Sequence, residues 1–85
     1  MTLGPLATKR NHALAYRKVP GFLRELRARA GLTQADVGAR TGTSQVFVAR
    51  CESGSRRVDV AEFIEIARAL GLDPVAALAE LVERK

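Results

Sequence analysis

The sequence predicts an all-α fold, a compact bundle of five helices. Three observations predict it: apolar residues recur at spacings of three and four, no stretch alternates in the manner of a strand, and cap residues and glycines divide the chain at short intervals. A chain of 85 residues makes one small domain, which buries only about 60% of the surface that its unfolded form exposes. The five helices must therefore share a small core.

Cap residues set the expected helix boundaries. Four side chains can accept a hydrogen bond from a free backbone N–H group at a helix start: Thr33, Ser44, Asp59 and Asp73. Four glycines suit the left-handed conformation that ends a helix: Gly31, Gly42, Gly54 and Gly71. Asp36 and Glu62 stand at capping-box positions, and Pro74 stands at a first helical position. The expected helices span residues 22–30, 33–42, 44–54 and 59–71, with a fifth running from 73 toward the C-terminus.

Each expected helix presents an apolar face to the core. The faces comprise Leu23, Leu26 and Ala30, then Val37, then Val48 and Cys51, then Val60, Phe63, Ile64, Ala67 and Leu70, and finally Val75, Leu78, Leu81 and Val82. We assign the last stripe to the core, although a late helix on so small a domain could also cover a two-fold partner. Cys51, the one cysteine, is expected to be a small core residue rather than a redox sensor.

Charge is distributed unevenly along the chain. Residues 1–57 carry 11 Lys and Arg against 3 Asp and Glu, a net charge of +8, whereas residues 58–85 carry 3 against 6, a net charge of −3, and the two sum to the formal +5. A basic front half favours contact with a polyanion such as nucleic acid. An acidic rear half favours contact with protein or with water alone.

Residues 1–18 are expected to form a basic, flexible N-terminal arm that precedes a domain at 19–85. The arm contains no acidic residue and four basic ones: Lys9, Arg10, Arg17 and Lys18. Two interpretations of these charges remain open, a solubilising tail and an arm that follows DNA phosphates. The NHALAYR stretch could also form a turn or two of helix before Pro20, and the lone His12 is expected to be exposed.

The stretch GLTQADVGARTGTSQVFVARCESGSRR, Gly31 to Arg57, contains two short expected helices joined at Gly42. Two helices with a tight glycine turn describe a helix-turn-helix. Gln34 and Gln45 each follow a cap residue, so both stand at helix N-termini, where free N–H groups and the positive end of the dipole favour a phosphate. A glutamine amide can donate to a phosphate or bind the N6/N7 edge of adenine through two hydrogen bonds.

Residues from about Phe22 to Pro74 resemble the Cro/cI-type (XRE-family) helix-turn-helix domain of phage repressors and bacterial regulators. The matching features are an arginine-rich first helix that ends at Gly31, then LTQ at 32–34, GTSQ at 42–45, ESG at 52–54 and ALGLDP at 69–74. The resemblance implies a lambda-repressor-like DNA-binding domain.

The resemblance also implies roles for individual residues. Four match positions that contact DNA phosphates: Gln34, Ser44, Arg56 and Arg57. Three match positions that face base edges in the major groove: Gln45, which suits adenine, Val46, which suits a thymine methyl, and Arg50, which suits guanine or a phosphate. Gln34 would also brace the recognition helix. Arg27 and Glu52 match an internal ion pair, which is structural rather than part of the binding surface.

Two departures from the family pattern affect these expectations. Gly38 stands where the family usually has alanine, at the closest approach of the second and third helices. We expect the contact to be preserved and the fold to tolerate the glycine, at a cost of about 0.5–1 kcal/mol to the second helix. Val46 and Phe47 are apolar where many relatives have polar residues, which puts hydrogen-bonded readout there in question. Phe47 either faces the bases or folds back into the core, and the second is favoured.

Catalytic and cofactor chemistry is not indicated. The sequence has no nucleophile with a plausible base, no glycine-rich phosphate loop and no Cys/His set with metal spacing, so we predict neither an enzyme nor a bound cofactor or metal. No apolar run approaches the roughly 20 residues of a membrane span, and the N-terminus lacks the pattern of a signal peptide. A single cysteine fits a reducing compartment, so we expect a cytoplasmic protein without membrane contact.

The sequence therefore predicts a transcriptional regulator that binds double-stranded DNA sequence-specifically as a homodimer, most simply a repressor that occludes a promoter at a palindromic operator. Two alternatives remain open. An antitoxin would use the same domain for autoregulation and a second surface for a protein partner, its toxin. A protein-interaction module would have lost DNA specificity and would work through its acidic rear half and last helix, an alternative that the apolar Val46 and Phe47 allow.

Overall fold

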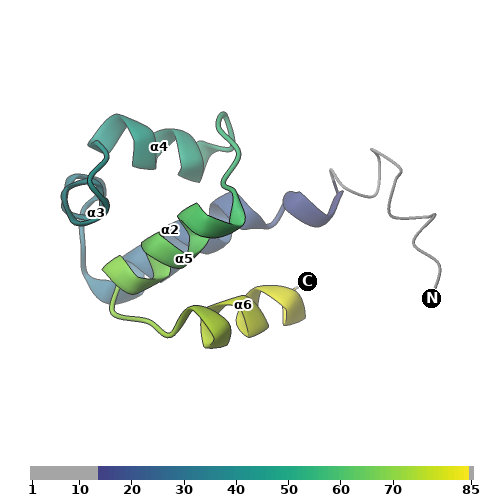
Figure 1. The fold of residues 1–85 in the computed structure, drawn as a ribbon. Helices are drawn as coiled ribbons and strands as arrows, with labels where there is room; N and C mark the ends of the chain where they lie inside the picture. The colour runs from purple at the N-terminus through teal and green to yellow at the C-terminus, as the bar shows by residue number, and fades with distance from the viewer. Residues whose placement is uncertain (1–13, 85) are drawn as a thin grey trace.

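The computed structural model describes residues 14–84, and within them five α-helices and no strand are present. They are α2 (Val19–Ala30), α3 (Gln34–Thr41), α4 (Gln45–Ser53), α5 (Val60–Ala69) and α6 (Pro74–Glu83), preceded by a helical turn at 14–16 (Figure 1). The prediction of an all-α fold with these five helices is confirmed. The first of them begins earlier than expected, at Val19, because Pro20 lies in the first turn, where a missing N–H group breaks no hydrogen bond.

The predicted caps are present at the starts of α3, α4, α5 and α6. At α3, Thr33 Oγ1 accepts a hydrogen bond from the Asp36 backbone N–H at 3.0 Å, and the Asp36 carboxylate accepts one from the Thr33 N–H at 2.9 Å. Asp59 and Glu62 form the same capping box at α5. Because these bonds are local in sequence, the start of each short helix can be specified without a tertiary contact.

The core lies where the five helices meet. α3 and α4 pack together on one side of the fold and α6 lies on the other, with α5 between them (Figure 1). The buried apolar side chains are Phe22, Leu23, Leu26, Val37, Val48, Cys51, Ile66, Ala67, Leu70 and Ala77. Cys51 is a buried core residue, as predicted, and burial raises the pKa of its thiol. Ala30 is exposed, contrary to expectation, and Leu32, just beyond the helix, packs against the core instead.

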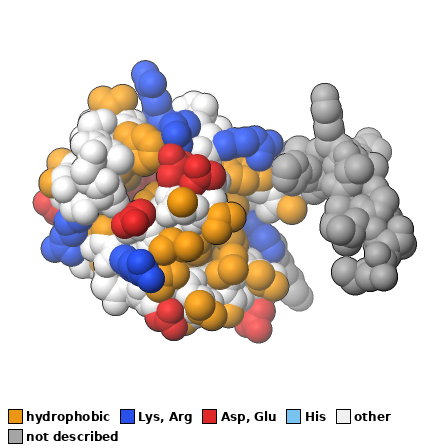
Figure 2. All heavy atoms as spheres, in the orientation of Figure 1, with side chains coloured by type: hydrophobic (Ala, Val, Ile, Leu, Met, Phe, Trp, Pro, Cys, Tyr) orange, Lys and Arg blue, Asp and Glu red, His pale blue; other side chains and the backbone are white. Residues whose placement is uncertain are grey.

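Several apolar residues of α5 and α6 are exposed, although we expected them to be in the core. Val60 and Val75 are 77% and 75% exposed, and Leu78 and Val82 are exposed as well, although the sequence pattern assigns all four to the core. α6 packs against α5 and turns the small Ala77 inward, which allows a close approach. The described part of the chain has no further helix to cover the remaining apolar side chains, and hydrophobic groups gather over this region in Figure 2.

The residues just before α2 pack on the domain. Tyr16 Oη accepts a hydrogen bond from the backbone N–H of Val58 at 2.7 Å, and Lys18 Nζ donates to the carbonyl oxygen of Arg84 at 2.7 Å. These contacts join the end of the expected arm to the loop before α5 and to the end of α6. Residues 1–13, which include two of its basic residues and the histidine, lie outside the described residues, so the expectations for them remain predictions.

Gly38 has a stronger role than the sequence suggests. A Cβ atom at this position would lie 2.6 Å from the carbonyl carbon and 2.8 Å from the carbonyl oxygen of Ser44. The backbones of α3 and α4 therefore approach more closely than a methyl group allows. From the sequence we expected that Gly38 costs the helix some stability. The structure adds that the absence of a side chain at Gly38 is what allows α3 to contact α4.

Gly38→Ala is expected to lower the free energy of unfolding by about 1–2 kcal/mol. The clash with the Ser44 backbone costs about 1–3 kcal/mol, and the higher helix propensity of alanine offsets less than about 1 kcal/mol of it. Urea unfolding followed by circular dichroism measures the change. The matched control is Gly21→Ala in α2, where a Cβ meets nothing within 4 Å and stability should rise by about 0.5–1 kcal/mol. Equal gains in both variants would show that α3 and α4 can move apart at no cost.

Candidate nucleic-acid interface

The connection between α3 and α4 is a tight, internally bonded turn. Gly42 has a φ of 69°, and the Thr43 N–H donates to the carbonyl oxygen of Gly38 at 2.8 Å. The hydroxyl groups of Thr41 and Thr43 lie 2.7 Å apart, in hydrogen-bond contact. Together with the close approach at Gly38, these bonds hold the two helices as one rigid unit, which is the arrangement that a helix-turn-helix requires.

A buried carboxylate ties this unit to α2. Arg27 Nε donates to Glu52 Oε2 at 2.6 Å and Arg27 Nη2 donates to Oε1 at 2.9 Å, while Nη1 reaches the carbonyl oxygen of Leu32 at 2.9 Å. Glu52 is 4% exposed. The structure therefore contains the ion pair that the family resemblance implies. Burial, the largest influence, acts to raise the pKa of Glu52, but hydrogen bonds from Arg27 and Gln34 outweigh it and hold that pKa below its usual value.

The two glutamines extend this bonded chain to the start of α4. Gln34 Nε2 donates to Glu52 Oε1 at 3.1 Å, and Gln34 Oε1 accepts a hydrogen bond from Gln45 Nε2 at 2.7 Å. Each amide NH₂ group has two protons, so Gln45 keeps one N–H and its own carbonyl oxygen for a ligand. Those are the two groups that bind adenine, and they are held in a fixed orientation. Gln34 keeps one side-chain N–H, so a phosphate contact is compatible with its bracing position.

Three further predicted contact residues lie on the outer side of the unit. Ser44 Oγ accepts the cap hydrogen bond from the Phe47 N–H at 3.1 Å, which leaves its hydroxyl proton free to donate. Val46 is 52% exposed. Arg50 is exposed and forms no ion pair with the described residues. α4 thus presents an amide, an apolar group and a guanidinium to solvent along one short helix.

Phe47 and Arg56 are occupied within the protein. Phe47 is half-buried and packs against the core, and the Arg56 guanidinium lies 4.6 Å from the centre of its ring. Arg56 also donates to both carboxylate oxygens of Glu62, at 2.8 Å each. These hydrogen bonds lower the pKa of Glu62. Phe47 therefore takes the inward position that we favour from the sequence, and Arg56 has partners that a DNA phosphate would have to replace.

Arg57 is held by an aromatic residue, Tyr16, to which the sequence analysis assigns no role. Its guanidinium lies 4.6 Å from the centre of the Tyr16 ring, and the same tyrosine accepts the hydrogen bond from Val58. Arg57 is exposed and has no carboxylate partner among residues 14–84. No local pattern could reveal this contact, because Tyr16 lies more than 40 residues away in the sequence.

Other kinds of site are not found in the part of the chain that the structure describes. No group of three or more His, Cys, Asp or Glu side chains is arranged to hold a metal ion there. Among the same residues, no helix combines the length and the apolar character needed to cross a membrane.

Comparison with known proteins identifies this arrangement. The helix-turn-helix domain family matches residues 21–81, and an XRE-family like protein from Pseudomonas syringae pv. tomato str. DC3000 has a similar structure. That protein is 42% identical, with a TM-score of 0.80, and the match covers 89% of this chain and 93% of the other. The chain belongs to the XRE family of helix-turn-helix proteins. The resemblance seen in the sequence is therefore confirmed, and the family match, which ends at residue 81, reaches into α6.

Two other proteins resemble this XRE domain. An uncharacterized HTH-type transcriptional regulator, y4dJ of Sinorhizobium fredii (strain NBRC 101917 / NGR234), is 44% identical over 50 residues, which are 59% of this chain and 65% of that protein. This chain thus spans less than two thirds of that regulator. The restriction-modification controller protein C.AhdI from Aeromonas hydrophila is 32% identical with a TM-score of 0.65, over 71% of this chain and 91% of the other.

The ion pair at Glu52 predicts how stability depends on pH. Because the folded-state pKa of Glu52 is lowered, its contribution is present above its unfolded pKa, about 4.5, and is lost as the pH falls through the folded value. We expect Glu52→Gln to be less stable than wild type by on the order of 3 kcal/mol at pH 7, and this difference should shrink below about pH 4.5. Urea unfolding across this pH range measures it.

Glu65→Gln is the matched control, since Glu65 is exposed and has no ion pair among the described residues. Its curve should run parallel to that of wild type, because the other carboxylates with lowered pKa values, Glu25, Asp36 and Glu62, titrate in both proteins. A difference between wild type and Glu52→Gln that stays constant down to pH 3 would contradict the assignment.

Proposed function

We propose that this XRE protein binds duplex DNA sequence-specifically and regulates transcription. One observation carries the proposal: Gln34 holds Gln45 at the start of α4 with the two adenine-binding groups of its amide free, and Arg50 of the same helix is exposed. A surface helix that served only for solubility would have no need of hydrogen bonds that connect one exposed amide, through Gln34, to the buried carboxylate of Glu52. The function assigned to y4dJ and to C.AhdI, regulation and control, is consistent with this proposal.

Base contacts would come from the exposed row on α4. Gln45 would bind the N6/N7 edge of adenine, and Arg50 would bind guanine O6/N7 or a phosphate. Val46 would contact a thymine methyl, the one feature of the major groove that an apolar side chain can select. Phe47 is left out of this set because its ring lies under Arg56 and against the core.

Phosphate contacts would set the register of α4 on the duplex. Ser44 and Gln34 stand at helix N-termini with donor groups free, and Arg57 is exposed next to the end of α4. Arg56 is the weaker candidate, since a contact with phosphate would break its two hydrogen bonds to Glu62. The net charge of +8 on residues 1–57 would add attraction that does not depend on sequence.

In the simplest form of this function, the protein acts in the cytoplasm as a homodimeric repressor. Two copies would place two α4 helices in successive major grooves, about 10 base pairs apart, so the operator would be an approximate palindrome. Repression would follow from occlusion of a promoter.

Selection from a randomised duplex library at near-physiological salt tests the function. The expected result is an enriched palindrome whose half-site centres lie about 10 base pairs apart, with adenine and guanine at the positions that Gln45 and Arg50 reach. Gln45→Ala and Arg50→Ala should each reduce discrimination at one position of each half-site by about 1–3 kcal/mol.

Arg29→Ala is the control for these variants, since Arg29 lies in the last turn of α2, outside α4, and pairs with Glu25 and Glu80. It should leave the selected sequence unchanged. Salt-sensitive binding without any enriched sequence would refute sequence-specific recognition. An enriched sequence that Gln45→Ala and Arg50→Ala select equally well would refute the assignment of the base-contacting residues.

A further inference from the structure

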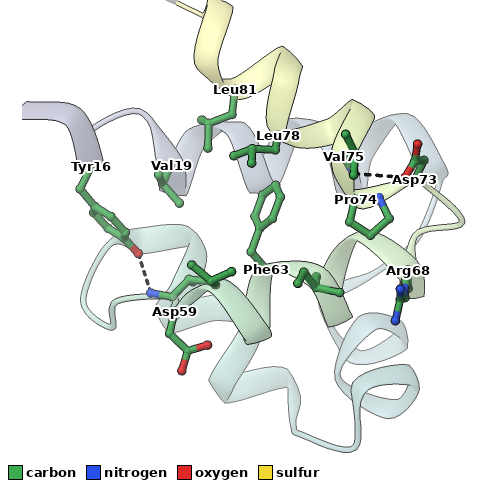
Figure 3. A pocket seen from close by; sticks show the side chains of 13 residues that line it. Tyr16, Val19, Asp59, Phe63, Arg68, Asp73, Pro74, Val75, Leu78 and Leu81 are labelled. Carbon is green, nitrogen blue, oxygen red and sulfur yellow. Dashed lines mark hydrogen bonds between the residues drawn. The ribbon is translucent and has the colours of Figure 1, made fainter. Parts of the chain in front are cut away.

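Tyr16 contacts two consecutive residues of the loop between α4 and α5. Its hydroxyl oxygen accepts a hydrogen bond from the backbone N–H of Val58 at 2.7 Å, and the Arg57 guanidinium lies 4.6 Å from the centre of its ring. Figure 3 shows the Tyr16 ring extending from the turn before α2, with its hydroxyl directed at that N–H group. One side chain from outside the helix-turn-helix unit thus contacts both the backbone and a charged side chain of this loop.

The peptide group between Arg57 and Val58 is hydrogen-bonded on both of its sides. Its N–H group donates to Tyr16, and its carbonyl oxygen accepts a hydrogen bond from Arg56 Nη1 at 2.8 Å. Arg56 is itself held by its two hydrogen bonds to Glu62 of α5. A peptide group has one donor and one acceptor, and both are used here. The backbone at Arg57 therefore cannot rotate without breaking one of these bonds.

The Val58 N–H group requires a partner from outside the loop. The side chain of Val58 is half-buried and packs against the core, so its backbone lies close to apolar groups. Val58 precedes Asp59, the cap residue of α5, so its N–H group lies outside the hydrogen bonds of that helix. A partly buried donor is costly to leave without an acceptor, and the phenol oxygen of Tyr16 supplies one at the end of a rigid ring.

The segment that carries Tyr16 is itself attached to the domain. Lys18 Nζ donates to the carbonyl oxygen of Arg84, just beyond α6, at 2.7 Å. Pro20, in the first turn of α2, lies against the start of the loop, since a Cβ atom at Gly54 would lie 3.4 Å from its Cγ atom. Both contacts are within four residues of Tyr16, so they limit the movement of its backbone.

The contact with Tyr16 leaves the Arg57 guanidinium available to a ligand. A cation over an aromatic ring is attracted to the face of the ring without a hydrogen bond, so its N–H donors remain for a phosphate. Arg57 is exposed and forms no ion pair with residues 14–84. A side chain that is already held in one orientation loses less conformational entropy when it binds.

We propose that Tyr16 is a positioning residue, which holds Arg57 for contact with a DNA phosphate. The proposal rests on the proposed function, in which Arg57 contacts the backbone of the duplex, and it adds the residue on which that contact depends. Tyr16 acts through its ring on the guanidinium and through its hydroxyl on the backbone of the same loop. The two actions can be removed separately by substitution.

Binding of the full chain to a duplex over a range of salt concentrations tests the proposal. Arg57→Ala should weaken binding to every duplex and reduce the slope of log K against log salt by about one. Tyr16→Leu should change both quantities in the same direction, by up to as much. In the Arg57→Ala protein, Tyr16→Leu should have no further effect, because the guanidinium that Tyr16 holds is gone.

Three comparisons separate positioning from loss of charge and from loss of stability. Arg68→Ala removes an exposed arginine without an ion pair among the described residues, at the opposite end from Tyr16 of the groove in Figure 3, and it should leave the slope unchanged. Tyr16→Leu and Arg50→Ala should act independently, since Arg50 lies on α4 rather than in the loop that Tyr16 contacts. A tyrosine that served stability alone would lower the urea midpoint on substitution and leave the salt slope of the folded protein unchanged.

Tyr16→Phe separates the action of the ring from that of the hydroxyl. It keeps the ring beside Arg57 but removes the oxygen that accepts the Val58 N–H, so that N–H group should exchange with solvent faster than in wild type. The salt slope should change less than in Tyr16→Leu. Hydrogen exchange is measured on the free protein, and fast exchange at Val58 in wild type would overturn the anchoring contact, whatever the protein binds.

The outcomes distinguish failure of this proposal from failure of sequence-specific recognition. Because a phosphate contact carries no sequence information, the variants are compared on the selected duplex and on an unrelated one. If no sequence is enriched but Tyr16→Leu still has no effect beyond Arg57→Ala, the positioning role stands and sequence-specific recognition fails. If wild type binds selectively but the two substitutions are additive, or Arg57→Ala leaves binding unchanged, the positioning role fails alone. Absence of any DNA binding would overturn both.

Discussion

The carboxylate of Glu52 is the constraint on which the rest of this small domain depends. A buried charge is stable only when its neighbours satisfy it, and here they come from two other helices, Arg27 of α2 and Gln34 of α3. The requirement to satisfy one carboxylate therefore fixes the mutual placement of α2, α3 and α4. The side chain of Gln45 is hydrogen-bonded to that of Gln34. The amide that would contact a base is therefore oriented by hydrogen bonds that lead to the buried carboxylate.

The arginines of the basic half divide into those engaged within the protein and those left exposed. Arg27 and Arg56 are bound to carboxylates, and Arg56 also covers the ring of Phe47. Arg50 and Arg57 have no such partners among the described residues, and they flank the end of α4. The net charge counts all four arginines equally. Their contacts show that two of them have structural partners, whereas the other two are available to bind a polyanion.

The sequence predicts what is local and misses what depends on distant partners. Thr33, Asp59 and the terminal glycines act within a few residues of themselves, so their roles can be derived from spacing alone. The ion pair between α2 and α4 follows only from the family resemblance. Periodicity shows that Val75 shares a face with its helix neighbours, but it does not show whether anything covers that face. The contact between Tyr16 and Val58 has no local pattern at all.

The close approach at Gly38 has a consequence for how such a domain can diversify. The spacing of α3 and α4 is set by backbone against backbone, at a position without a side chain, so it does not depend on which residues occupy the outer surface of α4. Substitutions at Val46 or Arg50 can therefore alter what the helix recognises without altering where it lies. The same scaffold can in this way acquire new binding preferences through single exposed residues, at little cost to its folding.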